Sequence, residues 1–177
     1  MHLNESLDNI TPPTREGYTF DGYFDASENQ YFNSSGTCLK TCPASLTTLT
    51  AKWTPITTTL TFNNGTGAVP ESNSINVTYD AVLPTVTVPI KTGYSFTGYY
   101  SSQSGGTKYY EDDGTSSSPS KFTTDTTIYA QWNANKYDIF CYGADDTICE
   151  KLTAVYDEPF PRITIPTLRG YTFSGYF

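Results

Sequence analysis

The sequence predicts a mainly β fold, or at most an α+β fold. It predicts that this fold consists of small tandem modules that contain little helix. Three observations lead to this prediction. Residues that favour strands are abundant, since Tyr, Phe and Trp alone make up 15% of the 177 residues and Thr and Val are common. Motifs recur with a period of about 77 residues. No segment keeps a helical hydrophobic period over three turns.

The repeat is carried most clearly by a Gly-Tyr-x-Phe-x-Gly-Tyr block. This block occurs at 17–24, 93–100 and 170–177, so its first glycines are 76 and 77 residues apart. Two further pairs of segments keep nearly the same spacing: 49–53 with 128–132, and 77–80 with 154–157. Agreement among three separate landmarks indicates that the chain contains tandem copies of one module.

The phase of these landmarks divides the chain into three parts. Residues 1–55 are expected to be the C-terminal part of a first repeat, 56–133 a complete repeat, and 134–177 the N-terminal part of a third. In this division each repeat closes shortly after its Leu/Ile-x-Ala-x-Trp segment. The neighbouring repeats of the same chain are therefore the first partners that the sequence predicts.

Alternation of apolar and polar residues predicts four strands in the complete repeat. The first covers 58–62, with Leu60 and Phe62 on one face. The second covers 75–79, where every second residue is apolar. Residues 83–89 follow as an extended connector or edge, because two prolines interrupt the segment and proline donates no hydrogen bond to a sheet.

The third and fourth predicted strands cover 93–100 and 127–132. Gly98 interrupts the alternation of the third strand, so we expect a bulge or a close approach of backbone there. The Ser- and Gly-rich stretch 101–125 between these strands is predicted to be a long loop. The first repeat has a shorter counterpart of this loop at 25–45.

Aromatic rings are expected to build most of the core, because the chain has one Met and each buried ring removes about 150–250 Å² from water. A module of this size cannot leave several rings in solvent. The predicted core comprises Tyr18, Phe20, Trp53, Leu60, Phe62, Tyr79, Tyr94, Phe96, Ile128, Trp132, Tyr156, Tyr171 and Phe173. Aromatic residues predicted to face outward are the candidates for a contact surface: Tyr99, Tyr109, Tyr110 and Tyr129.

The four cysteines form two close pairs in sequence, Cys38 with Cys42 and Cys141 with Cys149. Two local disulfides fit this spacing better than a zinc site, because the pairs lie in different repeats and no His is near. Free thiols and, less readily, metal ligation remain the alternatives. Disulfides would indicate an oxidising compartment.

Charge and composition exclude several classes of function. A net charge of −8 argues against a nucleic-acid partner, which requires clustered Lys and Arg. No apolar run reaches the length of a membrane helix, and no signal peptide is expected at the first residues. The single His, at position 2, leaves no Ser-His-Asp set, and no cofactor motif is present. We therefore expect no catalytic, cofactor-binding or metal-binding residues.

Two acidic clusters, 111–113 and 145–146, are candidate calcium ligands. Neither follows the spacing of an EF-hand loop through to a distal Glu. Solvated loop charge is the preferred interpretation of both clusters.

The pattern Pro-x-x-x-Gly-Tyr-[Thr/Ser]-Phe-x-Gly-Tyr, followed by Gly-Gly-Thr-Lys-Tyr and Ile-x-Ala-x-Trp, resembles the Listeria–Bacteroides repeat of internalin-type surface proteins. Here these elements are 89–100, 105–109 and 128–132. Tyr23, Tyr99 and Tyr176 stand where that family usually has Trp. The resemblance implies a small β-grasp-type module, arrayed in tandem in extracellular bacterial proteins.

This resemblance implies a non-catalytic spacer or stalk in a secreted, cell-surface or cell-wall protein, including proteins associated with adhesion. The alternatives are an adhesive module that binds a host receptor or a neutral glycan through avidity, and an accessory repeat of a secreted hydrolase. Membrane insertion of this segment is not expected.

Overall fold

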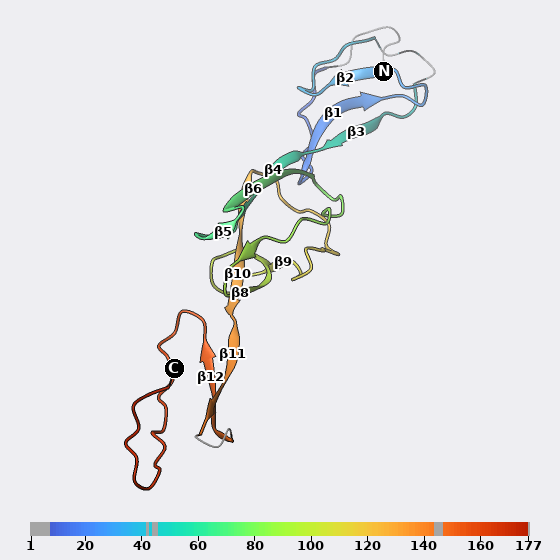
Figure 1. Cartoon of the computed structure of the whole chain (residues 1–177). Helices are drawn as coiled ribbons and strands as arrows, with labels where there is room; N and C mark the ends of the chain where they lie inside the picture. Colours follow the sequence, from blue (N-terminus) through green and yellow to red (C-terminus); the bar gives the residue numbers. More distant parts are fainter. Residues whose placement is uncertain (1–7, 42, 44–45, 144–146, 177) are drawn as a thin grey trace. The chain divides into compact units, whose positions relative to one another are not determined.

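The structure is a computed structural model that describes residues 8–41, 43, 46–143 and 147–176. Its described residues form strands, turns and loops without any helix (Figure 1). The prediction of a mainly β fold is therefore confirmed. A β-grasp module carries a helix across one face of its sheet, so the β-grasp part of the expectation receives no support.

The chain folds into two compact units. The first unit combines Met1–Phe62, Asn73–Thr85 and Thr115–Ile128, and the second combines Asn63–Ser72, Val86–Gly114 and Tyr129–Phe177. Each unit contains one of the two places where a repeat follows the previous one along the chain. These two places are described separately below.

The first repeat contributes a three-stranded sheet in the order β2-β1-β3. Its strands are β1 (Tyr18–Phe24), β2 (Gln30–Asn33) and β3 (Thr50–Pro55). Both neighbours run antiparallel to β1, and the register of β1 with β3 shifts between Phe20 and Gly22. That glycine has a φ of 138°, and a Cβ atom there would overlap the backbone oxygen of Phe32.

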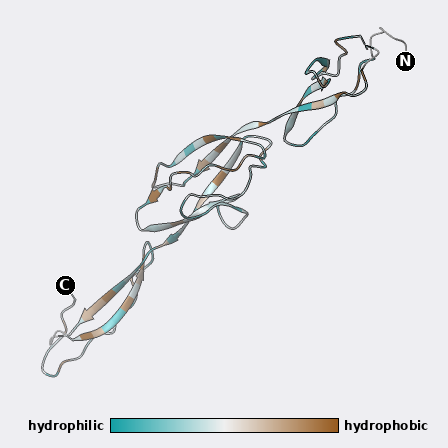
Figure 2. Ribbon diagram, turned by 90° about the vertical axis from the view of Figure 1, so that its right-hand side faces the viewer, coloured by the Kyte–Doolittle hydropathy of each residue, from teal (hydrophilic) through white to brown (hydrophobic). Residues whose placement is uncertain are grey.

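The complete repeat contributes a five-stranded sheet in the order β6-β4-β10-β8-β9. Its strands are β4 (Thr57–Asn63), β6 (Ser72–Thr78), β8 (Tyr94–Tyr100), β9 (Lys108–Tyr110) and β10 (Thr126–Ala134). Four of them match the strands predicted from alternation. The short β9 was not predicted, because it lies inside the Ser- and Gly-rich stretch assigned to a loop. Hydrophobic positions recur along the strands of this repeat (Figure 2).

Two further strand pairs complete the structure. Strands β11 (Lys136–Tyr142) and β12 (Ile148–Val155) form an antiparallel hairpin in the third repeat. Strands β5 (Ala68–Val69) and β7 (Ile90–Lys91) form a two-residue pair. Sequence spacing makes β1, β2 and β3 the counterparts of β8, β9 and β10, and makes β11 and β12 the counterparts of β4 and β6.

The bulge expected at Gly98 is present. Phe96 pairs with Trp132 and Gly98 with Gln131, so β8 carries one extra residue between these pairs. Gly98 has a φ of 132°, and a Cβ atom there would overlap the backbone oxygen of Tyr110. Only glycine combines this conformation with so close an approach of backbone.

The predicted core residues fall into three groups by exposure. Those fully or almost fully buried are Phe20, Leu60, Phe62, Tyr79 and Ile128. Those half-buried are Tyr18, Trp53, Tyr94, Phe96, Trp132 and Tyr156. Tyr171 and Phe173 are exposed, at 76% and 38%, so placing them in the core was wrong. No strand in the described part of the third repeat covers them as β10 covers β8.

Candidate functional site: the junctions between repeats

Two of the four tyrosines expected on a contact surface are instead fully buried. Tyr99 and Tyr110 have no exposed surface, and their rings meet edge to face at 5.9 Å. Loss of solvent raises the pKa of each to about 12. Assigning them to a contact surface was therefore wrong. Tyr109 and Tyr129 are half-buried.

Buried Asn64 organises the polar part of this core. Its side-chain Oδ1 accepts a hydrogen bond of 2.7 Å from the Tyr99 hydroxyl, and its Nδ2 donates one of 2.9 Å to the Pro70 carbonyl. The indole Nε1 of Trp132 donates to the Asn64 carbonyl at 3.1 Å. Asn64 follows β4 in a sequence typical of a turn, so nothing in the sequence distinguished it from a solvated turn residue. Its contacts assign it a structural role.

The cysteines do not form the disulfide expected in the third repeat. Cys141 is buried and Cys149 is exposed, and both are free thiols. Cys141 pairs with Glu150 across the hairpin, whereas Cys149 lies at the register shift next to that pair. Cys38 is also free. The expected Cys38–Cys42 disulfide is therefore not formed either, although Cys42 itself lies outside the described residues.

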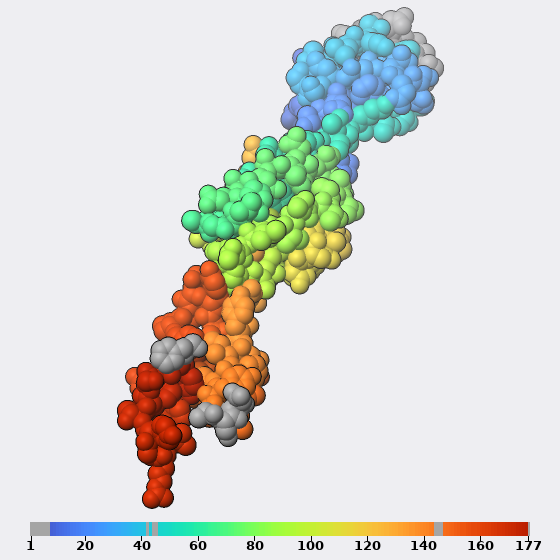
Figure 3. All heavy atoms as spheres, viewed as in Figure 1, coloured from blue at the N-terminus to red at the C-terminus, as the bar shows by residue number. Residues whose placement is uncertain are grey.

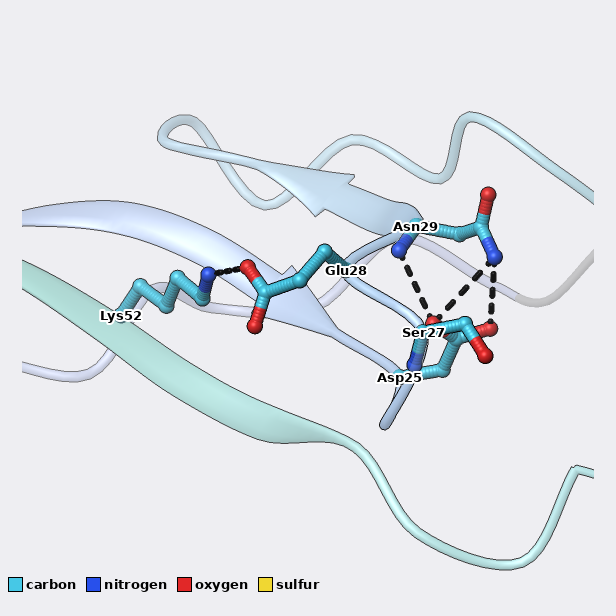
Figure 4. Close-up of polar contacts among 5 residues, drawn as sticks. All are labelled: Asp25, Ser27, Glu28, Asn29 and Lys52. Carbon is cyan, nitrogen blue, oxygen red and sulfur yellow. Dashed lines mark hydrogen bonds and ion pairs between the residues drawn. The ribbon is translucent and has the colours of Figure 1, made fainter.

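The acidic turn between β1 and β2 has its charges satisfied locally (Figure 4). One oxygen of Asp25 accepts backbone N–H bonds of 2.9 Å from both Ser27 and Asn29. These bonds, that of Asn29 first, lower the pKa of Asp25. Glu28 forms an ion pair with Lys52 of β3. The turn is thereby a closed structural unit that leaves little for an added cation to bind.

Metal binding and membrane insertion find no support elsewhere in the described chain. Glu111 of the first acidic cluster pairs with Lys108, and the cluster at 145–146 lies outside the described residues. Among those that are described, His, Cys, Asp and Glu do not gather in groups of three that could hold a metal ion. The same residues include no helix long and apolar enough to cross a membrane.

The first junction between repeats is fixed by backbone hydrogen bonds at a connector of one residue. Ile56 alone separates β3 from β4. Its N–H donates to the Gly17 carbonyl, and its own carbonyl accepts from the Tyr79 N–H, both at 2.9 Å. Gly17 has a φ of 76°, and a Cβ atom there would overlap the Tyr79 ring. The connector therefore joins both repeats through its own peptide groups.

Side chains reinforce this first junction. The Tyr18 hydroxyl donates a hydrogen bond of 2.8 Å to Asp80 Oδ2, and the Tyr18 and Tyr79 rings meet edge to face at 5.7 Å. Lys121 pairs with the other oxygen of Asp80 and lies over the Tyr79 ring at 4.9 Å. The Arg15 guanidinium lies over the Tyr18 ring at 3.8 Å.

The charges of this cluster favour its folded arrangement. Lys121 first and the Tyr18 hydroxyl second lower the pKa of Asp80. The hydrogen bond to Asp80 raises the pKa of Tyr18, and contact with Asp80 likewise raises the pKa of Lys121. At neutral pH the carboxylate, phenol and ammonium thus all keep the protonation states that the contacts require.

The second junction repeats this geometry. Asn135 alone separates β10 from β11; its N–H donates to the Gly93 carbonyl at 2.8 Å, and its carbonyl accepts from the Tyr156 N–H at 2.9 Å. The Tyr94 hydroxyl donates to Asp157 Oδ2 at 2.7 Å, which raises the pKa of Tyr94. The rings of Tyr94 and Tyr156 meet edge to face at 5.5 Å.

Smaller details of the junctions also correspond. Lys91 lies over the Tyr94 ring at 4.6 Å, as Arg15 lies over Tyr18. Asp80 and Asp157 both adopt left-handed backbone conformations, with φ of 63° and 60°. Ser95 donates to the side chain of Asn135 at 2.7 Å, a contact special to the second junction. Because the same arrangement of contacts occurs at both junctions, the junctions between repeats are the candidate functional sites of this chain.

The sequence contains both motifs that form the junctions, but it does not show that these motifs contact each other. The Gly-Tyr pair opens each repeated block, and the Tyr-Asp pair at 79–80 and 156–157 was recognised as a second landmark. Their contact joins residues 62 and 63 positions apart. One sequence shows that both motifs recur, but only the fold shows that they bind each other.

Comparison with known proteins agrees with the repeated architecture. Residues 1–52 and 59–131 each match the Listeria-Bacteroides repeat domain. These two segments cover most of the chain.

Three curated relatives are similar to this chain. Internalin H of Listeria monocytogenes is 35% identical over 136 residues, which cover 75% of this chain and 22% of that protein. A protein of Evansella cellulosilytica whose name describes a Gly-rich membrane protein is 26% identical over 97% of the chain and 19% of its own length. A further protein of that organism, named as a membrane protein, is 22% identical over 97% of the chain and 24% of its own length. The chain thus spans about a fifth to a quarter of these relatives.

Proposed function

The chain belongs to the Listeria-Bacteroides repeat family, and from this premise we propose that it is a non-catalytic spacer of a secreted or cell-surface protein. Its task in this proposal is to hold successive repeats at a defined spacing. The partners of each repeat are its neighbours in the same chain. The similarity to Internalin H supports a location at the cell surface or in the cell wall.

The observation that carries the proposal is the pair of equivalent junctions. A flexible linker needs residues free of hydrogen bonds, yet Ile56 and Asn135 each use both peptide groups to bridge two repeats. A hydroxyl–carboxylate bond and an edge-to-face ring pair then hold each junction. Restraint of the connector from two sides favours a semi-stiff array over a chain of freely jointed modules.

The test is small-angle scattering on the 177-residue chain and on a variant with Asp80→Ala and Asp157→Ala. We expect the unaltered chain to fit a narrow distribution of the radius of gyration, and the double variant to fit a broader one. Asp138→Ala is the matched control, because Asp138 pairs with Lys151 inside the β11–β12 hairpin and not at a junction. Equal, broad distributions for all three proteins would overturn the proposal.

An adhesive role is the second candidate, and the half-exposed Tyr109 and Tyr129 favour it. Exposed tyrosine rings are common at binding surfaces, and several copies along an array could act through avidity. Binding to neutral glycans or host proteins that is lost in Tyr109→Ala and Tyr129→Ala variants, with unchanged thermal unfolding, would support this role. Retained binding in both variants would exclude these two side chains.

A further inference from the structure

The turn after β4 contains two residues that can react with each other. Asn64 is followed by Gly65, and this Asn-Gly pair occurs once in the 177 residues. Glycine has no side chain to shield its backbone nitrogen, so the nitrogen can approach the side-chain carbon of the preceding asparagine closely. The segment that carries the pair lies at the surface of the complete repeat and is green in the space-filling view (Figure 3).

The two residues of this pair have different surroundings. Gly65 is exposed, and a Cβ atom there would meet nothing within 4 Å. Asn64, in contrast, is only 1% exposed. Water can thus reach the peptide on the glycine side, whereas the core encloses the amide group of Asn64.

Hydrogen bonds hold both ends of the Asn64 amide group. Its Oδ1 accepts from the Tyr99 hydroxyl at 2.7 Å, and its Nδ2 donates to the Pro70 carbonyl at 2.9 Å. Attack by the Gly65 nitrogen would change Cγ from planar to tetrahedral and expel Nδ2. The reaction therefore has to displace the amide group from both partners, which are themselves part of a site that excludes water.

The backbone around Asn64 is fixed as well. The Gly65 N–H donates to the Asn63 Oδ1 at 3.0 Å, which occupies the nitrogen that would attack. The Asn64 N–H donates to the Glu71 carbonyl at 2.8 Å, and the Asn64 carbonyl accepts from Trp132 Nε1 at 3.1 Å. The folded turn thus restrains both groups that have to meet.

We propose that Asn64-Gly65 is a self-modification site that the fold keeps inactive and that reacts when the complete repeat opens. The Gly65 nitrogen gives up its proton and bonds to Asn64 Cγ, while the Cγ–Nδ2 bond breaks, so that ammonia leaves and a five-membered succinimide remains. One water molecule then opens the ring at either of its carbonyl carbons. Opening at Cγ gives aspartate at position 64, and opening at the backbone carbon gives isoaspartate.

Neither product fits the site that is built around Asn64. A carboxylate has no donor for the Pro70 carbonyl, and its charge would be buried in the core. In isoaspartate the main chain passes through the side-chain carbons, so the carbonyl that accepts from Trp132 leaves the peptide backbone. Conversion therefore opposes refolding, and it gives the complete repeat a permanent chemical mark of having opened. This property goes beyond the spacer function.

The third repeat provides an internal reference. Its counterpart of Asn64 is Gly143, since the Asn64 N–H donates to the Glu71 carbonyl and the Gly143 N–H to the Thr147 carbonyl, each at 2.8 Å. Gly143 carries no amide side chain. Opening of the β11–β12 turn therefore leaves no equivalent mark, and the site is particular to the complete repeat.

The test compares the 177-residue chain in its folded state and in denaturant during incubation at neutral pH. Peptide mass spectrometry follows the exchange of the side-chain amide for a carboxyl group and separates aspartate from isoaspartate. We expect conversion of Asn64 in denaturant, and conversion at least about a hundredfold slower in the folded chain, because only its opened fraction reacts. Asn76 is the internal control, since the branched Val77 follows it, and it should remain unconverted over the same period.

Three variants test the chemistry and the protection separately. Tyr99→Phe removes one bond to the Asn64 amide and should speed conversion in the folded chain roughly fivefold. Tyr100→Phe is the matched control on β8, because its hydroxyl donates to the Thr97 carbonyl instead, and it should leave the rate unchanged. Gly65→Ala, measured in denaturant where folding plays no part, should lose most of the conversion, because the added methyl group shields the nitrogen.

Refolding measures the consequence of the reaction. A chain that is held in denaturant until Asn64 is converted, and then returned to native conditions, should have an unfolding equilibrium shifted toward the unfolded state on the order of a hundredfold. Asn64→Asp should reproduce this shift at neutral pH. A chain taken briefly through the same denaturant, without time to react, is the control and should recover its original stability.

The proposal is overturned by equal rates in the folded and unfolded chain, by earlier conversion at another asparagine, by equal rates for Tyr99→Phe and Tyr100→Phe, or by full stability of the converted chain. None of these measurements involves a junction between repeats. The scattering test of the spacer function is therefore independent, and its failure would leave the reactivity of Asn64 unchanged.

Discussion

A side chain at Gly93 would overlap the aromatic ring of Tyr156, which packs directly on the glycine backbone at the second junction. Gly93 also has a φ of 78°, a conformation that costs other residues about 1 kcal/mol or more. We therefore expect Gly93→Ala to destabilise the chain by about 2–4 kcal/mol, through strain and displacement of the ring together. Chemical denaturation, followed by the ring signals of Tyr156, measures the effect.

Gly65→Ala is the control for that substitution. Gly65 has nearly the same φ, 80°, but a Cβ atom there meets nothing within 4 Å. It should show the cost of backbone strain alone. Equal losses in the two variants would mean that Tyr156 does not depend on the absence of a side chain at Gly93.

Acid should weaken the first junction through Asp80. Its pKa is lowered in the folded chain, so its contribution to stability is present above the ordinary carboxyl pKa of 3.8 and is lost as the pH falls through the lower folded value. The difference in unfolding free energy between the unaltered chain and Asp80→Asn should therefore shrink as the pH falls below about 4. A difference that stays constant from neutral pH down to pH 2 would contradict this.

The buried side chains of Tyr99 and Tyr110 should lose their protons only at a pH above the ordinary tyrosine pKa. The pKa of both Tyr99 and Tyr110 is raised to about 12, so their stabilising effect is complete below the ordinary value of 10.0 and is lost as the pH rises toward 12. Tyrosinate absorbance should consequently rise in two phases, with the later phase coupled to unfolding. Tyr99→Phe should reduce the later phase, because one of the two tyrosines with a pKa raised to about 12 is then absent.

Substitution of Asn64 is expected to lower the free energy of unfolding of the complete repeat strongly. Asn64→Ala leaves the Tyr99 hydroxyl and the Pro70 carbonyl without this partner in a buried site, and each lost partner costs about 1–3 kcal/mol. We expect a total loss of about 2–4 kcal/mol in the free energy of unfolding. Asn133→Ala, at an exposed position of β10, serves as the control and should be nearly neutral.

The two thiols of the third repeat should differ in reactivity. Cys149 is exposed and Cys141 is 5% exposed, so a thiol reagent should modify Cys149 first and Cys141 only when the hairpin opens. Intact mass with and without reductant checks that both are free beforehand. Equal rates at both positions would show that the hairpin does not protect Cys141.

Most strands could be predicted from the sequence because alternation and repetition support one another. The error at Tyr99 shows where this reasoning stops. Counting every second residue from Tyr94 and Phe96 places Tyr99 on the outer face, but the extra residue at the Gly98 bulge reverses the phase. Tyr99 thereby returns to the side of Phe96, and the two rings meet at 4.9 Å. The bulge was predicted; its effect on the next side chain was not.

The contacts at the junctions could not be predicted from the sequence, for a different reason. Periodicity within one strand reports which face a residue occupies, but says nothing about a partner 62 residues away, as Asp80 is from Tyr18. Likewise, the short pairing segments β2 and β9 have compositions typical of loops. They are strands because β1 and β8 present free edges to them, which is a property of the tertiary structure.

The one-residue connectors at Ile56 and Asn135 have a consequence for inheritance. The tyrosine–carboxylate bond at each junction joins a Gly-Tyr pair to a Tyr-Asp pair about 62 codons downstream, so recombination between misaligned copies that adds or removes one whole period restores this bond at each new boundary. Array length can then vary among descendants without fresh adaptation at any boundary, whereas a crossover out of register would separate the two motifs and be selected against.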